Sequence, residues 1–124
     1  MNKKRPKHLD LRLIKLPLAG YVSILHRISG ALLFLALPLL LWALQCSLKS
    51  IETYTVLSGL LLHPLGKLFA LLVLWAFLHH LCAGIRYLAI DMDFGVARAQ
   101  ARTSARWVLA VSLTLTVLLG ARLW

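Results

Sequence analysis

Acidic residues are scarce in this sequence of 124 residues: it contains four Asp and Glu against fourteen Lys and Arg, and only 15% of its residues are charged. The formal net charge of +10 accompanies a hydrophobic content of 60% and a mean hydropathy of +0.82. A soluble domain needs more polar surface than this, and a disordered chain contains far fewer apolar residues. The composition therefore excludes both classes and indicates a small integral membrane protein whose basic residues lie outside the hydrocarbon.

Cysteine is also rare, and the two that are present, Cys46 and Cys82, lie in apolar stretches. We interpret them as small apolar residues rather than as a disulfide or a metal pair. The first 27 residues lack the apolar core of a cleavable signal peptide, so we expect none. Once the membrane spans are subtracted, too little chain is left for a separate catalytic domain. We therefore expect no independent enzymatic activity.

Long uncharged runs mark the membrane spans. Lys, Arg, Asp and Glu are missing from three runs of 21, 18 and 15 residues: 28–48, 68–85 and 107–121. At 1.5 Å per residue the first run crosses about 30 Å of hydrocarbon, and the others do so with the help of snorkelling basic ends. Trp107 and Trp124 flank the third run as an aromatic belt would.

These runs predict an all-α membrane protein with three transmembrane helices. We expect a single membrane-anchor domain over 1–124, with helices over about 22–48, 64–90 and 105–124 after an N-terminal segment of residues 1–21.

The distribution of basic residues predicts the orientation. Eleven of the fourteen Lys and Arg lie in two segments, 1–27 and 86–106. The positive-inside rule makes these segments cytoplasmic. We therefore expect a cytoplasmic N-terminus, an external loop over 49–67, a cytoplasmic loop over 88–106 and a periplasmic C-terminus. Because the basic residues flank membrane spans and no folded scaffold presents them, we do not expect nucleic acid as a partner.

A first group of polar residues lies at the start of the first span. Its members are spaced at i, i+3, i+4 and i+7, so they share one face of a helix: Ser23, His26, Arg27 and Gly30. Ionisable residues next to hydrocarbon are costly and commonly mark functional sites. We interpret the face as a candidate site. The simpler alternative is that Arg27 is a snorkelling anchor and His26 an interfacial residue.

A second group lies at the cytoplasmic end of the second span. Four of its residues form a stripe at i, i+4, i+7 and i+11: His80, Gly84, Tyr87 and Asp91. Because this span runs opposite to the first, we expect Arg86 and Asp91 to lie level with the first group. His80 is expected about two turns deeper.

A neutral imidazole buried in a helical bundle, such as that of His80, is a good ligand for haem iron. Gly84 would leave room for the macrocycle, and the cationic His26 and Arg27 would bind its anionic propionates. The alternative is a histidine that is hydrogen-bonded across the bundle. His79 projects about 100° away from His80, and His26 is expected nearer the surface. A haem held between two imidazoles would therefore need a partner subunit that completes the bundle.

Two motifs carry a resemblance to a known family. Ser23 to Gly30 reads SILHRISG and His80 to Arg86 reads HLCAGIR, in the first and second of the three spans. Smaller matches accompany them: Arg5-Pro6, Leu9-Asp10-Leu11, Pro17 and Asp91. With these motifs nearly the whole chain resembles the cytochrome b large membrane-anchor subunit of bacterial succinate dehydrogenase. Because the resemblance starts at Arg5, it favours a multi-pass protein of a bacterial inner membrane rather than an organelle protein with a presequence.

The resemblance implies a role in complex II, which links the tricarboxylic acid cycle to electron transport. In that complex a flavoprotein subunit oxidises succinate, an iron–sulfur subunit carries the electrons, and ubiquinone is reduced at the membrane surface. Two small anchor subunits hold the soluble pair at the lipid bilayer, share one haem b and help to form the quinone pocket. The implied cofactor is haem b, the implied substrate is ubiquinone, and the second anchor would supply the other axial haem ligand.

The same resemblance implies roles for individual residues. His80 matches the axial ligand of the haem iron. Ser23 and Arg27 match residues of the quinone site, while His26 and Arg27 match the neighbourhood of the haem propionates. Three further residues are candidates for the surroundings of this site: Gly84, Arg86 and Asp91.

Tyr87 departs from the family pattern, which often has histidine at this position. A phenol, unlike an imidazole, does not change its protonation near neutral pH, so any proton-transfer or propionate-binding role of that histidine is in doubt here. Two other functions stay open: a haem-free structural anchor, and a small transporter or proton relay that uses His80, Arg86 and Asp91. The direction of the reaction, succinate oxidation or fumarate reduction, also stays open, although the motifs favour succinate oxidation.

Overall fold

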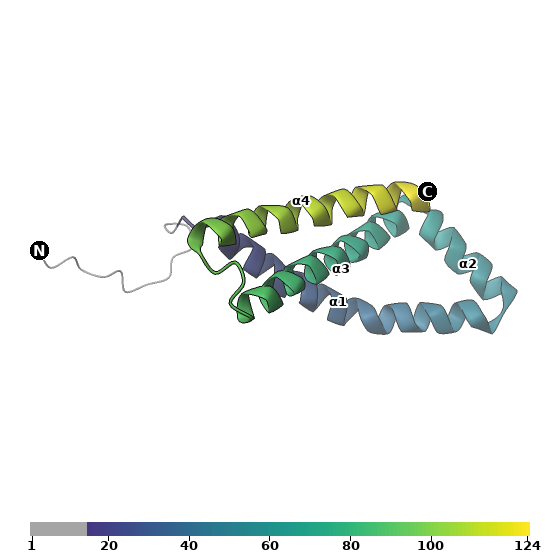
Figure 1. Ribbon diagram of the computed structural model, residues 1–124. Coiled ribbons are helices and arrows are strands. Elements are labelled where there is room, and N and C mark those ends of the chain that lie inside the picture. The colour runs from purple at the N-terminus through teal and green to yellow at the C-terminus, as the bar shows by residue number, and fades with distance from the viewer. Residues whose placement is uncertain (1–14) are drawn as a thin grey trace, which may run out of the picture.

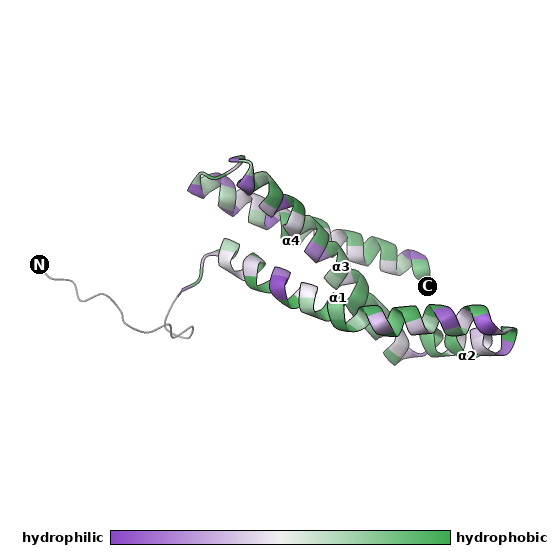
Figure 2. Ribbon diagram, turned by 90° about the horizontal axis from the view of Figure 1, so that it is seen from below, coloured by the Kyte–Doolittle hydropathy of each residue, from purple (hydrophilic) through white to green (hydrophobic). Residues whose placement is uncertain are grey.

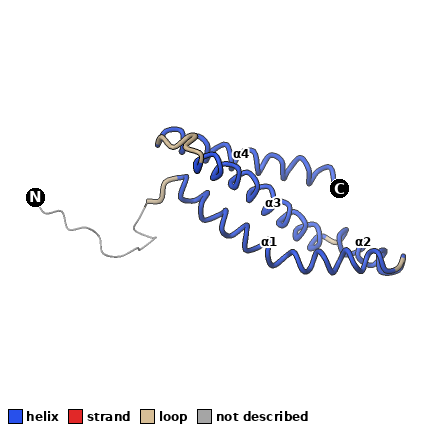
Figure 3. Tube along the Cα trace, turned by 60° about the horizontal axis from the view of Figure 1, so that its bottom comes forward, coloured by secondary structure: helices blue, strands red, loops and turns tan. Residues whose placement is uncertain are grey.

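The computed structural model describes residues 15–124; residues 1–14, which include the Arg5-Pro6 and Leu9-Asp10-Leu11 parts of the motif, lie outside the described residues. The described chain forms four helices joined by short loops, without strands (Figures 1 and 3). In chain order they are α1 (Leu18–Lys49), α2 (Ile51–Leu62), α3 (Pro64–Asp91) and α4 (Arg98–Leu123).

Three of these helices, α1, α3 and α4, are long and apolar enough to cross a membrane. They contain 32, 28 and 26 residues, which correspond to about 48, 42 and 39 Å at 1.5 Å per residue. Each therefore exceeds the roughly 30 Å of a bilayer's hydrocarbon. The prediction of an all-α, multi-pass membrane protein with three long apolar helices is confirmed.

The long helices extend beyond the apolar runs. α1 begins at Leu18 rather than near residue 22, and α4 begins at Arg98 rather than near residue 105. The first turns of α4 are rich in Ala, Arg and Gln, which favour helix whether or not they lie in hydrocarbon. Much of the basic segment that was expected to form a loop is therefore helical.

The segment 49–67, expected as a loop, contains the twelve-residue helix α2. Ser50 caps this helix by accepting a hydrogen bond from the Thr53 amide at 3.2 Å, and Pro64 begins α3 directly after it. At about 18 Å, α2 is too short to cross a bilayer. It runs back from the end of α1 to the start of α3 (Figure 1). A search for long uncharged runs does not detect so short a helix.

The core lies where α1, α3 and α4 meet, since α3 packs against both of the other long helices. Four buried residues form its centre: Val22, Ala83, Ala105 and Val108. Three of the four come from α3 and α4, and two are alanines, which let helix backbones approach closely. This core therefore holds the start of α1 against the end of α3, where the polar residues of both helices lie.

Most large apolar side chains point away from this small core. Phe34 and Leu48 of α1, for example, are 76% and 78% exposed. Figure 2 shows mostly hydrophobic residues along α1 and α3, whereas hydrophilic residues are frequent in the first turns of α4. Such apolar faces require lipid or another protein as a neighbour.

Candidate functional site

Two imidazoles, one from α1 and one from α3, stack on each other at the centre of the candidate site. The rings of His26 and His80 have centroids 4.2 Å apart and planes inclined by 14°, and both side chains are half-buried. The expected depths are therefore wrong: His80 does not lie about two turns deeper than His26 but level with it. The reason is the register in which the antiparallel helices α1 and α3 pack, which also sets Gly84 beside His26 and Gly30 beside His80.

The hydrogen bonds of the His80 ring indicate its tautomer. Its Nδ1 lies 3.1 Å from the backbone carbonyl oxygen of His26 and 3.3 Å from the hydroxyl oxygen of Ser29. A carbonyl only accepts hydrogen bonds, so Nδ1 carries the proton and donates it. In a neutral imidazole, Nε2 then holds the free lone pair, which is the form that binds a metal.

Glycines adjoin both rings of the stacked pair. A Cβ atom added at Gly30 would lie 2.9 Å from Cε1 and 3.2 Å from Nδ1 of His80, closer than side chains normally approach. A Cβ at Gly84 would lie 3.8 Å from Nε2 of His26, which is an ordinary contact. Gly30 is thus needed for the close approach of α1 to His80, while Gly84 leaves free space beside His26.

His79, the neighbour of His80, projects away from it as the helical geometry predicts, and the structure directs it to α4. Its side chain is fully buried, its Nδ1 lies 3.5 Å from the Ser112 hydroxyl, and its ring stacks on that of Trp75 with centroids 5.4 Å apart. The carbonyl of Val22 lies near this ring, but among the described residues no hydrogen-bond partner reaches Nε2. His79 therefore belongs to the packing of α3 on α4 rather than to the His26–His80 pair.

The predicted quinone residues lie on α1 beside the stacked pair. Ser23 is half-buried, and Arg27, one turn further along, is exposed. A hydroxyl and a guanidinium at this spacing offer hydrogen-bond donors and positive charge to a ligand that approaches from outside. The structure thus places Ser23, His26 and Arg27 within one turn of helix.

The remaining predicted residues lie at the end of α3. Arg86 was expected to lie beside the polar residues of α1, but it contacts α4 instead. Its guanidinium donates from Nε to the Ser104 hydroxyl at 2.9 Å and from Nη2 to the Ala101 carbonyl at 3.2 Å, both on α4. Asp91, the last residue of α3, is exposed. The sequence could not predict this, because a helical stripe does not say which neighbouring helix it faces.

The ring of Tyr87 contacts both Arg86 and His26 of the stacked pair. Its ring lies 5.3 Å from that of His26 and 5.2 Å from the guanidinium carbon of Arg86. Its hydroxyl is buried and has no hydrogen-bond partner within residues 15–124. A buried hydroxyl without a partner costs about 1–3 kcal/mol, so this group indicates an acceptor or a donor from outside the described chain.

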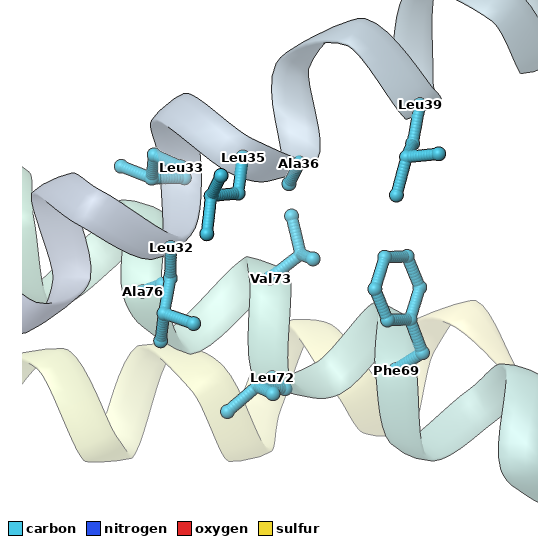
Figure 4. A pocket seen from close by; sticks show the side chains of 9 residues that line it. All are labelled: Leu32, Leu33, Leu35, Ala36, Leu39, Phe69, Leu72, Val73 and Ala76. Carbon is cyan, nitrogen blue, oxygen red and sulfur yellow. The ribbon is translucent and has the colours of Figure 1, made fainter.

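The interior beyond the histidines is apolar. A cavity of about 120 Å³ lies between α1 and α3, and Figure 4 shows Val73 and Phe69 of α3 facing α1 across it. Ala76, one turn from His80 on α3, is part of its wall. Polar groups therefore end at the His26–His80 pair, and the rest of this interface is lined by hydrocarbon.

Two contacts of the site were not predicted from the sequence. Ser29 lies in the SILHRISG motif but has no assigned role there, although its spacing of three residues from His26 places it within reach of that residue's carbonyl. Ser104 of α4 holds Arg86, and no local pattern marks it. Such contacts between distant segments depend on helix register, which a single sequence does not reveal.

Comparisons with known proteins agree over nearly the whole chain. The family model of the succinate dehydrogenase/fumarate reductase transmembrane subunit matches residues 1–119. The succinate dehydrogenase cytochrome b556 subunit of Coxiella burnetii is 43% identical over 125 residues, with 100% of both chains covered. The proteins of that name from Paracoccus denitrificans and Rickettsia felis are 32% and 34% identical; the matches cover 92% and 94% of this chain and 88% and 90% of the relatives.

Proposed function

The chain belongs to the family of succinate dehydrogenase cytochrome b membrane subunits, and on this basis we propose that it anchors succinate:ubiquinone oxidoreductase, complex II, in a bacterial inner membrane. In this proposal it shares one haem b with a second small anchor subunit and helps to form the site where ubiquinone is reduced. The electrons come from succinate through a flavoprotein and an iron–sulfur subunit. The chain alone has no enzymatic activity.

The observation that carries the haem proposal is the hydrogen bonding of His80. Its Nδ1 donates to the His26 carbonyl, which leaves Nε2 as a free lone pair on a half-buried ring. A carbonyl that accepts a hydrogen bond from the ring nitrogen facing away from the metal is the usual support of a metal-binding histidine. The residues therefore fit haem b, with His80 as one axial ligand. When bound, haem b supplies a one-electron carrier.

The companion anchor would supply the other imidazole that holds the haem. Among the described residues, each of the other histidines has a different contact: His26 stacks on the face of His80, His79 is buried against α4, and His63 caps the start of α3. This distribution supports a haem that is bound between two chains. The exposed apolar side chains of the long helices give the companion a surface to cover.

The haem propionates would be bound by cations and donors near the stacked rings. Arg27 is exposed one residue after His26, and both residues lie near the start of α1, which is cytoplasmic in the proposed orientation. The buried Tyr87 hydroxyl adds a donor beside His26. A phenol donates a hydrogen bond to a carboxylate without a change of charge, so Tyr87 can serve as a binding residue but not as a proton shuttle.

The quinone proposal depends on Ser23 and Arg27. Reduction of a quinone takes two electrons and two protons, and negative charge develops on its carbonyl oxygens. The Ser23 hydroxyl can donate to such an oxygen, and the Arg27 guanidinium can stabilise its charge at a level where water supplies protons. The basic residues that flank the spans support a cytoplasmic position for this end of the bundle, and the soluble subunits would bind on that side.

The experiment that tests haem ligation compares two neighbouring histidines in the assembled complex. We expect His80→Leu to abolish the optical and paramagnetic signature of a bis-imidazole haem, because the iron loses a ligand. The control, His79→Leu, removes an imidazole of the same size that faces α4, and the signature should persist.

An unchanged bis-imidazole signature in His80→Leu would contradict the proposal. A reduced-minus-oxidised spectrum without a b-type band in membranes that overproduce the wild-type complex would instead favour a haem-free anchor.

A further inference from the structure

Three groups of α1 converge on the His80 ring, which extends towards α1 from the neighbouring helix α3. The His26 carbonyl and the Ser29 hydroxyl face Nδ1, and the backbone of Gly30 lies against Cε1. We propose that Ser29 is a positioning residue for His80: together with the His26 carbonyl and the bare backbone of Gly30, it fixes the plane of the imidazole. This inference depends on the proposed ligation of haem by His80.

The hydrogen-bond roles around Ser29 are mutually consistent. The Ser29 hydroxyl donates to the His26 carbonyl at 2.9 Å, so its proton is not available to the His80 ring. Its oxygen lone pairs face the Nδ1 proton of His80 at 3.3 Å. The Nδ1 proton thus lies between two acceptors, the carbonyl and the hydroxyl, which hold it from two directions. Rotation of the ring about its Cβ–Cγ bond would lose both contacts.

The residues around His80 restrict the movement of its ring. Ser29 is fully buried, so water does not compete for its hydroxyl. The His26 ring covers one face of the His80 ring at 4.2 Å. Gly30 sets the distance between α1 and the ring edge, because a methyl group there would lie 2.9 Å from Cε1. Rotation of the ring would therefore lose hydrogen bonds, and the backbone of Gly30 limits how far the ring can move towards α1.

A fixed imidazole plane has a measurable consequence at a bound haem. Hydrogen bonds to the outer ring nitrogen orient an axial ligand and raise its donor strength, and both effects change the electronic state of the iron. In a low-spin ferric haem with two imidazole ligands, the largest g value depends on the angle between the two ring planes. This signal reports on the His80 ring rather than on the fold.

The chain contains a matched control for Ser29. Ser112 is also fully buried, also donates to a carbonyl of its own helix, that of Leu109 at 3.2 Å, and also lies beside Nδ1 of a histidine. Its histidine, however, is His79, which faces α4. Substitution of Ser112 by alanine therefore removes an equivalent buried hydroxyl from the same bundle and leaves His80 untouched.

The test uses the whole complex purified with Ser29→Ala or Ser112→Ala. In Ser29→Ala we expect bound haem with a shifted largest g value, and transfer of haem to apomyoglobin about tenfold faster than in the wild type. In Ser112→Ala both quantities should equal those of the wild type. A wild-type g value and transfer rate in Ser29→Ala would overturn the positioning role, as would equal changes in the two variants.

A second pair of variants tests the steric part. Gly30→Ala adds a methyl group against the ring, whereas Gly59→Ala adds one on α2 where no atom lies within 4 Å. We expect Gly30→Ala to shift the g value or lose haem, and Gly59→Ala to do neither. Wild-type haem in Gly30→Ala would overturn this part of the inference.

Two further outcomes keep the test decisive. If Ser29→Ala does not assemble, Ser29→Thr retains the hydroxyl: a wild-type g value would support the inference and an altered one would overturn it. His80→Leu separates this inference from the proposed function. If that variant loses the bis-imidazole signal while Ser29→Ala is unchanged, only the positioning role fails; if it keeps the signal, the proposed ligation itself fails.

Discussion

At the scale of single residues, the site combines a tightly held side chain with a free one. The ring of His80 is bonded at Nδ1 and covered by His26, whereas Arg27 is exposed on the same stretch of α1. A metal ligand benefits from a fixed orientation, and a residue that meets an exchangeable substrate needs access to it. This contrast supports the proposed division of roles, in which His80 binds haem and Arg27 serves the quinone.

The prediction at this scale concerns Arg27. Because the side chain is exposed, we expect Arg27→Ala to assemble normally but to lower succinate:quinone turnover about 10²-fold, the usual cost of one donor to a developing oxyanion. Succinate oxidation with a soluble artificial acceptor should be unaffected. Arg102→Ala, which removes an exposed arginine from α4, is the control for net charge. Normal quinone turnover in Arg27→Ala would exclude the proposed role.

At the scale of helices, Arg86 joins α3 to α4. The residue is 8% exposed, and its guanidinium donates to Ser104 and to the Ala101 carbonyl and lies over the ring of Tyr87. Arg86 thus contacts α4, whereas the stacked histidines belong to the other interface of α3, the one with α1. The two interfaces of α3 therefore differ. The interface with α1 contains the candidate site, and the interface with α4 holds that helix in the bundle, because α4 packs mainly on α3 and less on α1.

The prediction at the scale of helices tests this tie. Ser104→Ala leaves the Nε donor of a buried guanidinium without its acceptor, which should cost about 1–3 kcal/mol of stability. We expect a lower midpoint of thermal unfolding for the purified complex and an unchanged haem spectrum. Thr103→Val is the control, because the Thr103 hydroxyl is exposed and bonds only to the Ala99 carbonyl of its own helix. Equal midpoints for the two variants would contradict a stabilising role for the tie.

At the scale of the whole molecule, the chain is incomplete by itself. Its core is small, most of its large apolar side chains are exposed, and the hydrogen bond at Nδ1 of His80 leaves the Nε2 lone pair of that ring free. A larger apolar cavity of about 740 Å³ lies between α1, α2 and α3. These features are those of one subunit of a helical bundle in a membrane rather than of a self-sufficient protein.

The prediction at this scale concerns haem incorporation. Produced without its companion anchor, in a host that lacks its own complex II, the chain should insert into the membrane but give no bis-imidazole haem signal. Production together with the companion should restore the signal, because the second imidazole is then present. Optical and paramagnetic spectra of the two membrane preparations provide the comparison. A bis-imidazole signal from the chain alone would show that both ligands lie within it.

The sequence by itself determined the class of the protein, its three long apolar helices and the residues of the two polar groups. Uncharged runs, basic flanks and the SILHRISG and HLCAGIR motifs are local features, and helical periodicity places their members on common faces. The interpretation of Cys46 and Cys82 as small apolar residues rests on the same apolar runs, and both side chains are half-buried.

Only the tertiary structure decided how these faces meet. Four features depend on how the helices are connected and in which register they pack. They are the stack of His26 on His80, the hydrogen bond between Ser29 and His80, the contact of Arg86 with α4, and the helix α2. Periodicity gives the direction of a side chain relative to its own helix axis, but the depth and rotation of one helix against the next follow from the packing of all three. The tautomer of His80 is the clearest case, because it depends on a carbonyl 54 positions away in the chain.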